Sequence, residues 1–437
     1  MYKIYLLIVD YNLVRFDDVK IMTDYAKSHY QLQVILIRPN ATEIDNRIAD
    51  VVIDLDPRSK DFLDVAYQQL QPYYPQIKAG IVFSDNAVFY GAQLLKKLGL
   101  SVDSPMLSDA AYSKIIYRQR EQQYKLIAQE QHLLVPDFEI IYTVKDLKNF
   151  ASNHPAGFVL KPSCEGNNRG VIILRKGENW EQAFETLHEY LNDGIIAESL
   201  IPFEEEFSFD GLAHLSFITE KMTAHGKYPV EYGQIVRAHS EMRLNTLVTQ
   251  AGRFANFIVG QHSGPFHNEI KLSNSKKIAA VIEPNRRPAG MKIWNLAEKI
   301  YGINFYRLWI DSVVLESLPA TLPVPQGIAA IRMLGSPSKG VLSLPDFIVE
   351  NPKLLFERVL SLLENRFSFS PPLKWFGFQL NKKNGDALHN IPKNNADFVA
   401  QACVYSQDDT IDMRAVLNEL ENCWLQCLEE FIAEVVV

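Results

Sequence analysis

Carboxylate and amide side chains follow one another on two apolar, strand-like segments in the middle of the chain. The first segment, FHNEIKL, carries Glu269, and the next, AAVIEPNRR, carries Glu283, Asn285 and Arg287. Side chains two residues apart on a strand share one face, so the last three lie together. Carboxylate and amide oxygens suit Mg²⁺, and a nearby arginine can stabilise a developing phosphoryl charge. The spacing predicts a site that holds one or two Mg²⁺ ions against a triphosphate; structural salt bridges are the alternative.

A lysine ends the strand-like run GFVLKP, and a loop of small residues separates it from the next strand. Lys161 in such a place can reach phosphate oxygens as a point charge. Ser163, Gly166 and Gly170 allow backbone amides to approach an anion without an intervening side chain. This pattern predicts a hairpin that folds over a nucleotide, and an ordinary surface hairpin with two turn glycines is the alternative.

A third segment consists of two strands joined by a short acidic connector. The apolar run IIAESL contains Glu198, and a second strand, EFSFDGL, begins after Glu204 and Glu205. Backbone groups of such a connector can read the edge of adenine, and a carboxylate some eight residues after Glu198 can accept hydrogen bonds from ribose hydroxyls. Three consecutive glutamates are also typical of a solvated loop, which is the alternative interpretation.

The elements that position these residues divide the chain into three parts. Residues 1–108 alternate short apolar runs (IYLLIV, VILI, VVIDL, AGIVF) with helical patterns, which predicts an α/β domain with a Rossmann-like parallel sheet. No GxGxxG occurs, so this architecture does not predict a dinucleotide. Residues 109–315 begin with linker helices at 109–135 and continue as an α+β region. Residues 316–437 start in the proline-rich PATLPVP and predict a C-terminal α+β domain with two closing amphipathic helices.

Composition excludes several classes of function. The formal net charge is −8 and no long run of Lys and Arg occurs, so a nucleic-acid partner is not expected. No apolar run approaches the roughly 18 residues of a membrane span, so no membrane partner is expected. The four cysteines form no CxxC pair, which indicates a reducing, cytoplasmic location and no zinc site. Both a monomer and a homodimer are compatible with the composition.

The order of these motifs resembles the ATP-grasp superfamily, and within it the amino-acid (dipeptide) ligase branch. The resemblance covers about residues 110–345 and is most specific at Glu-x-Asn-x-Arg-Pro-x-Gly, which starts at Glu283. It implies an α+β ATP-grasp fold with ATP and Mg²⁺, or Mn²⁺, as cofactors. Position by position, it places Lys161, Ser163 and Gly166 at the phosphates, Glu198, Ser199, Leu200 and Ile201 at adenine, and Glu206 at ribose. By the same resemblance Glu269, Glu283 and Asn285 are metal ligands, and Arg287 contacts the transferring phosphoryl group.

Departures from the family pattern leave three assignments open. The family's second nucleotide lysine is either Lys114 or Lys125. The connector is one residue longer than in D-alanine ligases, so either Glu205 or Glu206 contacts ribose. His267 lies on the same strand face as Glu269, and it is either catalytic or structural.

The resemblance also implies where the substrates bind. It places the acceptor pocket at residues 227–239, where Glu231 can hold an ammonium group and Arg237 a carboxylate, with His239 nearby. Gly290 lies where the family shapes the site for the carboxylate substrate. The alternative for residues 227–239 is a surface loop.

The expected activity is that of an ATP-dependent carboxylate-amine ligase. One small-molecule carboxylate is activated as an acyl phosphate, and the amine of an amino acid then attacks it to form an amide or dipeptide. A D-alanine-type ligase would use the same chemistry. A carboxylase would share the nucleotide site, but the chain has no Met-Lys-Met biotinyl signature. A nucleotide-binding regulatory module without turnover is the alternative from another class.

Overall fold

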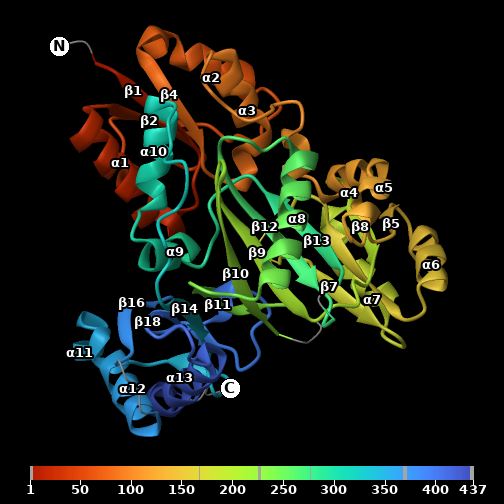
Figure 1. Cartoon of the computed structure of the whole chain (residues 1–437), viewed down its shortest axis with the longest axis vertical. Coiled ribbons are helices and arrows are strands. Elements are labelled where there is room, and N and C mark those ends of the chain that lie inside the picture. Colours follow the sequence, from red (N-terminus) through yellow and green to blue (C-terminus); the bar gives the residue numbers. More distant parts are fainter. Residues whose placement is uncertain (1–2, 167, 225–227, 276, 368–371, 434–437) are drawn as a thin grey trace.

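The N-terminal region folds into a four-stranded parallel sheet with helices on both faces (Figure 1). The computed structural model describes residues 3–433 except 167, 225–227, 276 and 368–371. In spatial order the strands are β3 (Val51–Asp54), β2 (Gln33–Arg38), β1 (Tyr5–Val9) and β4 (Ile77–Val82). Alternate side chains of β1 enter two separate cores. One core contains α1 (Phe16–Tyr30), and the other contains α2 (Phe62–Leu70) and α3 (Val88–Lys97).

The segment 109–135, where linker helices are predicted, contains α4 (Lys114–Gln123) and α5 (Lys125–Glu130). Tyr124 separates them because its backbone leaves the helical conformation. A small antiparallel sheet follows, with α6 (Val144–Asn153) and α7 (Trp180–Thr186) packed on it. Its strands, in spatial order, are β5 (Phe138–Ile141), β8 (Ile195–Ser199), β6 (Gly157–Pro162) and β7 (Ile172–Arg175).

An eight-stranded antiparallel sheet forms the centre of the molecule. In spatial order its strands are β13 (Ala279–Asn285), β12 (Pro265–Leu272), β9 (Glu205–Leu212), β10 (Leu215–Thr223), β11 (Glu231–Arg237), β14 (Ile328–Leu334), β18 (Ala400–Ser406) and β16 (Lys374–Leu380). The predicted boundary at 315/316 falls between two strands of this one sheet, because β14 pairs with β11.

The period of two on β9 decides which face of the large sheet is apolar. Phe207 and Phe209 pack with α8 (Met242–Val259), while Ser208 and Asp210 on the opposite face bond to each other. The helix presents an apolar stripe and ends at Gly260, whose left-handed φ of 64° suits glycine. We call the opposite side of the sheet the polar face; it carries Glu206, Ser208, Asp210, Lys221, His267, Glu269, Lys271, Glu283 and Asn285.

Two helices fasten the large sheet to the N-terminal sheet. They are α9 (Ile293–Tyr301) and α10 (Phe305–Leu315), and their apolar side chains share a core with β1, β10 and β14. The C-terminal helices α11 (Asp346–Glu350), α12 (Lys353–Arg366) and α13 (Met413–Leu428) enclose another core with β14 and β18. A small sheet of β17 (Ala387–Leu388), β15 (Gly340–Leu342) and β19 (Ile432–Ala433) completes this end.

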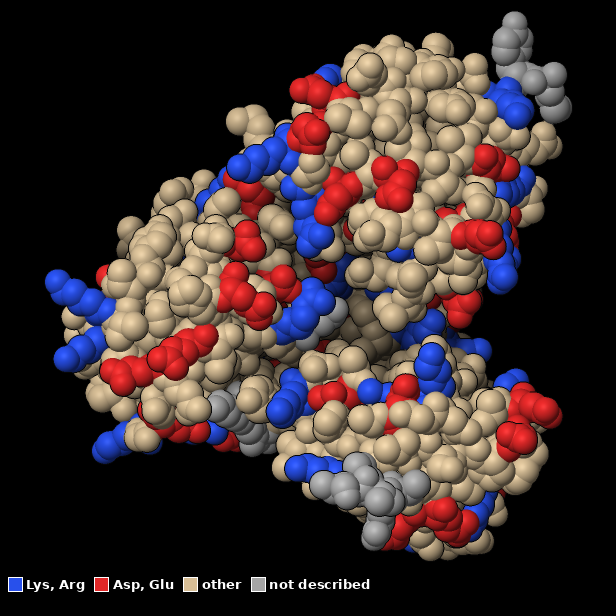
Figure 2. All heavy atoms as spheres, turned by 180° about the vertical axis from the view of Figure 1, so that it is seen from behind, with Lys and Arg blue, Asp and Glu red and all other residues tan. Residues whose placement is uncertain are grey.

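From behind, the molecule is hollowed where its parts meet, and Lys and Arg side chains lie along the edge of the hollow (Figure 2). Within the described part of the chain, no helix combines the length and apolar character needed to cross a bilayer.

Candidate active site

The predicted metal ligands lie opposite one another on two neighbouring strands. In the register of β12 and β13, Glu269 pairs with Glu283 and His267 pairs with Asn285. The Asn285 side-chain amide donates to the backbone oxygen of His267 at 3.0 Å, which leaves its carbonyl oxygen as the free end. The two strands therefore gather two carboxylates and one amide oxygen on the polar face.

This donor set, two carboxylates and one amide oxygen, fits Mg²⁺ or Mn²⁺. Among the described residues, no three His, Cys, Asp or Glu side chains cluster closely enough to enclose a metal ion. Mg²⁺ is commonly held by one or two carboxylates together with substrate phosphates and waters. Glu283 and Asn285, with Glu269 beside them, could supply the protein's share of such a shell.

The first residue of α4 contacts this group. Lys114 lies 3.1 Å from Glu283 (Nζ to Oε2) and donates to the backbone oxygen of Glu165 at 2.7 Å. Burial would lower the pKa of Lys114, but Glu283 outweighs burial and raises it. Ser113 caps the helix by accepting from the backbone N–H of Ile116. Lys125, the competing candidate, instead lies 3.7 Å from Asp137.

The two strand-end residues of the small sheet are bound to each other. Lys161 Nζ lies 2.7 Å from Glu198 Oε2, and the guanidinium of Arg118 donates to both Glu198 oxygens at 3.1 and 3.2 Å. Burial would raise the pKa of Glu198, but Arg118 and Lys161 outweigh burial and lower it to about 2. The ionised Glu198 side chain therefore links α4 to the small sheet. We call the group of Glu198, Arg118 and Lys161 the clamp.

The remaining connector and loop residues lie around this clamp. Ser199 accepts through its side chain from the backbone N–H of Asp137, and Ser163 hydrogen-bonds to Ser113 at 2.8 Å. A cavity of about 80 Å³ opens between Glu198 and the predicted metal ligands Glu283 and Asn285. Its lining includes Ser113, Lys114, Gly166, Glu198, Glu283 and Asn285, which come from four separate elements.

Charges alternate across the strands of the polar face. Asp210 contacts His267 at 2.6 Å, His267 lies 3.4 Å from Glu269, and Lys221 lies 2.7 Å from Glu269 and 2.5 Å from Glu231. Burial would lower the pKa of His267, but Asp210 and Glu269 together outweigh burial and raise it to about 9. His267 is thus cationic at neutral pH, and its charge supports Glu269.

The two open alternatives at the ribose position differ in their contacts. Glu206 is on the polar face, where it lies 3.1 Å from Lys271 and accepts from the Thr223 hydroxyl at 2.5 Å. Glu205 is the neighbouring residue on the same strand, and so it points to the other face. Only Glu206 of this pair shares a face with Glu269.

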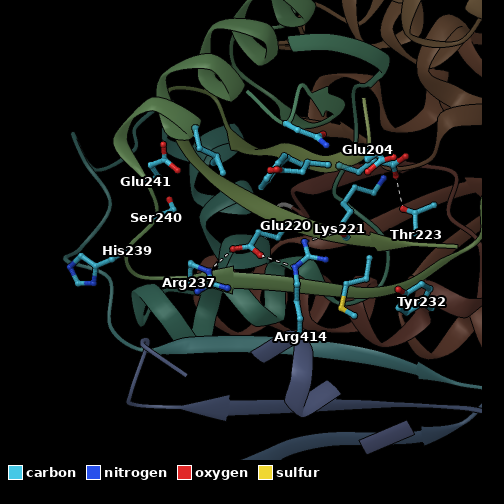
Figure 3. Close-up of a pocket in the computed structure, with 16 residues that line it drawn as sticks. Glu204, Glu220, Lys221, Thr223, Tyr232, Arg237, His239, Ser240, Glu241 and Arg414 are labelled. Atoms are coloured by element: carbon cyan, nitrogen blue, oxygen red, sulfur yellow. Dashed lines mark hydrogen bonds and ion pairs between the residues drawn. The ribbon is translucent and has the colours of Figure 1, made fainter. Parts of the chain in front are cut away.

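Arg237 and His239 do not join Glu231, contrary to the expectation of one shared pocket. Glu231 contacts Lys221, whereas Arg237 forms an ion pair with Glu220, and adjacent residues of β10 point to opposite faces. Arg237 and the exposed His239 line an open groove of about 790 Å³ (Figure 3). Glu206 and Lys221 also line this groove, and Glu231 does not. Arg414 reaches into this groove and lies 3.5 Å from Glu220 (Figure 3).

The segment after β13 carries Arg287 and Gly290. Arg287 lies 2.6 Å from Asp85 of the N-terminal domain (Nε to Oδ2). An added Cβ at Gly290 would meet no atom within 4 Å, so the space beside it is open.

Comparison with solved structures assigns the fold. An L-amino acid ligase from Bacillus licheniformis superposes with a TM-score of 0.73 at 16% sequence identity, over 97% of this chain and 98% of that one. The chain has the ATP-grasp fold. The predicted N-terminal parallel sheet and the α+β region after it are thereby confirmed.

Other ATP-grasp structures match over nearly the whole chain. N5-carboxyaminoimidazole synthetase from Staphylococcus aureus, solved with ADP, gives a TM-score of 0.63 at 14% identity, over 96% of this chain and 98% of that one. The biotin carboxylase domain of Hydrogenobacter thermophilus 2-oxoglutarate carboxylase, solved with MgADP, gives 0.60 at 12% identity, over 96% and 90%.

Sequence similarity to curated proteins covers only part of the chain. Alanine–anticapsin ligases from Bacillus subtilis and Bacillus amyloliquefaciens are each 24% identical over 208 residues, which is 42% of this chain and 44% of each relative. The chain thus matches less than half the length of these curated relatives. No family model matches the sequence.

Three further residues of this candidate site were not predicted from the sequence. Arg118 follows Lys114 by four positions on one helix face, a spacing that signals a shared environment. Asp85 follows the apolar run AGIVF, and polar residues after a parallel strand commonly reach ligands. Lys221 gave a weaker signal, a lone lysine within the strand LSFITEKMT.

Proposed function

We propose that this chain is an ATP-dependent ligase that activates a carboxylate as an acyl phosphate and couples it to the amine of an amino acid. The products are an amide or dipeptide, ADP and phosphate. The names of the relatives, alanine–anticapsin ligase and L-amino acid ligase, support this choice among ATP-grasp activities. The observation that carries it is the pairing of Glu269 with Glu283 across β12 and β13, beside Lys114.

In this proposal the nucleotide binds between the small sheet and the polar face. Lys114 and Lys161 supply two positive charges for its phosphates, and Glu206 is in position to accept from ribose hydroxyls. Lys161 is already oriented by Glu198, so little side-chain freedom is lost when a phosphate binds. Residues 199–204 are the connector beside which adenine would lie.

The metal site supports phosphoryl transfer. Glu269, Glu283 and Asn285 would hold Mg²⁺ or Mn²⁺, and a bound ion neutralises charge on the transferring phosphoryl group. Arg287 adds a fixed positive charge near the same cavity. The substrate carboxylate attacks the γ-phosphorus, ADP leaves, and an amine attacks the acyl carbon so that phosphate leaves.

Water exclusion determines whether coupling outcompetes hydrolysis. The acyl phosphate is hydrolysed if water reaches it before the amine does. The loop of residues 163–170 borders the cavity through Cys164, Glu165, Gly166 and Arg169. We assign to this loop the role of covering the reacting groups.

The deciding experiment is phosphate release from Mg²⁺-ATP across a matrix of paired amino acids and small carboxylates, with mass spectrometry of each stimulated mixture. A substrate labelled with ¹⁸O in its carboxylate should transfer one label to the released phosphate, because that oxygen bridges the acyl phosphate. ADP, phosphate and a condensed product are expected. Phosphate release that depends on bicarbonate alone would instead indicate a carboxylase, and tight Mg²⁺-ATP binding without any turnover would indicate a regulatory module.

A further inference from the structure

An ion pair joins the N-terminal domain to the segment that follows the metal-ligand strand. Asp85 Oδ2 lies 2.6 Å from Arg287 Nε, although the two residues are 202 positions apart in the sequence. Asp85 lines the same cavity as Lys114, Glu283 and Asn285, and it adds to the negative charge around Lys114. The N-terminal domain thus contributes a carboxylate to the wall of the candidate active site.

Asp85 is presented by a rigid part of the N-terminal domain. It lies three residues after the end of strand β4, at the start of a short 3-10 helix (Asp85–Ala87). Phe83 is buried and stacks on Trp309 of α10, with ring centroids 5.9 Å apart. The Ser84 hydroxyl hydrogen-bonds to Asp10 at the end of β1. The two residues that precede Asp85 are therefore fixed by contacts that do not involve Arg287.

The contacts of Arg287 fix one side of its guanidinium. Nε donates to Asp85, and Nη1 donates to the backbone oxygen of Pro288 at 3.2 Å. Arg15 of the N-terminal domain also donates to that Pro288 oxygen, at 3.4 Å. Within the described part of the chain, Nη2 of Arg287 makes no hydrogen bond, so its two hydrogens remain available for an anion. A guanidinium held at two nitrogens is pre-organised for the third.

We propose that Asp85 is a positioning residue that acts through Arg287, an inference that rests on the proposed function. Asp85 sets the direction of the guanidinium so that Nη2 meets the charge that develops during phosphoryl transfer and acyl attack. Fixed donors stabilise a transition state more than mobile ones because they need no reorganisation at the moment of reaction. The N-terminal domain thereby takes part in the chemistry without touching the reacting atoms.

The competing explanation is that the pair merely joins two domains. The Asp85 side chain is 33% exposed, and partly exposed ion pairs contribute little to stability. The two explanations therefore predict different losses. Loss of a pair that only joins the domains would leave kcat unchanged, whereas loss of a positioning residue lowers kcat.

The first test does not depend on activity. A crystal structure of the Asp85→Asn variant, compared with one of the wild-type protein, should show the Arg287 guanidinium rotated away from its wild-type position while β13 stays in place. An Arg287 side chain that keeps its position in the variant would overturn the proposal. This comparison decides the matter even if the wild-type protein fails to turn over any substrate, which would be a failure of the proposed function alone.

The second test is a double-mutant cycle on phosphate release and product formation. Asp85→Asn should lower kcat about 10- to 100-fold, as expected for one charge-assisted hydrogen bond, and leave the KM for ATP unchanged. Asp85→Glu should restore part of the loss. Arg287→Ala should lose more, and adding Asp85→Asn to it should lose nothing further. Additive losses in the double variant would show that Asp85 does not act through Arg287.

A matched control separates positioning from general effects of charge. Asp109 forms a similar ion pair, 2.7 Å from Arg120, and its side chain is 27% exposed. Asp109→Asn removes the same charge from a pair that does not include Arg287. It should leave kcat at the wild-type value, and a kcat as low as that of Asp85→Asn would contradict a specific role for Asp85.

Discussion

Replacing Glu198 with glutamine tests the clamp that joins α4 to the small sheet. Glu198 accepts hydrogen bonds from Lys161 and from two nitrogens of Arg118. Arg118 is completely buried and also contacts Glu121 and the backbone oxygens of Val281 and Ile282. Glutamine keeps the shape of the side chain but removes the charge, so two buried cations lose a shared partner.

Two independent arguments give similar magnitudes for this change. Removing one partner of a buried ion pair typically costs about 3–5 kcal/mol. Lowering the pKa of Glu198 from 4.5 to about 2 corresponds to about 3 kcal/mol, at about 1.4 kcal/mol per pH unit. A loss of about 3 kcal/mol lowers the midpoint of thermal unfolding by about 6 to 12 °C for a unit of roughly 200 residues.

The pH dependence of this effect has a definite sign. A carboxyl group whose pKa is lowered by folding stabilises the protein above its unfolded pKa, and this contribution is lost as pH falls through the folded pKa. The difference in unfolding free energy between wild type and Glu198→Gln should therefore be constant above about pH 5.5 and shrink as the pH falls from 4.5 toward 2.

Urea unfolding followed by tryptophan fluorescence, at pH 7 and at steps down to pH 3.5, measures this difference. Glu185→Gln is the control, because Glu185 is exposed on α7 in the same part of the molecule. The control should unfold like the wild type at every pH. A Glu198→Gln variant that loses less than about 1 kcal/mol at pH 7, or a loss that does not shrink with falling pH, would refute the clamp as described.

Five further substitutions, in three experiments, test the nucleotide and metal assignments. Glu283→Gln should abolish ATP turnover with an unchanged circular dichroism spectrum, and near-normal phosphate release would show that the metal site lies elsewhere. Lys114→Met should raise the KM for ATP at least about tenfold, as loss of a charged phosphate contact does, while Lys125→Met should leave it unchanged; steady-state kinetics of both variants decide between the two lysines. Glu206→Gln should weaken binding of a fluorescent ADP analogue about tenfold and Glu205→Gln should not, and the reverse order would assign ribose to Glu205.

Local pattern was sufficient for much of the fold and for the composition of the site. Alternating apolar runs and helical patterns predicted the N-terminal parallel sheet, which the structure confirms. The period of two placed Glu283 and Asn285 on one strand face, and the register of β12 and β13 brings Glu269 and His267 opposite them. Side-chain direction within a strand depends only on position along it, so the sequence determines it directly.

Pairings between distant segments depended on the tertiary structure. The order of strands in the large sheet places Lys221 in contact with both Glu231 and Glu269. It also places Arg237 in contact with Glu220, on the opposite face of the sheet. That Lys114 lies beside Glu283 and Lys125 beside Asp137 follows from where α4 begins relative to β13. The contact of Asp85 with Arg287 exists because α9 and α10 fasten the N-terminal sheet to the large sheet.

The physical reason for this division is the range of the interactions. Strand alternation, helix capping and turn preferences act over a few residues, so the sequence by itself determined which side chains share a face and which types of ligand they offer. Ionic partners are chosen by distance in space and by burial, which strengthens a charge pair and penalises an unpaired charge. Only the folded tertiary structure sets those distances. It therefore determines which cationic side chain pairs with each carboxylate, namely Glu198, Glu269, Glu283 and Asp85.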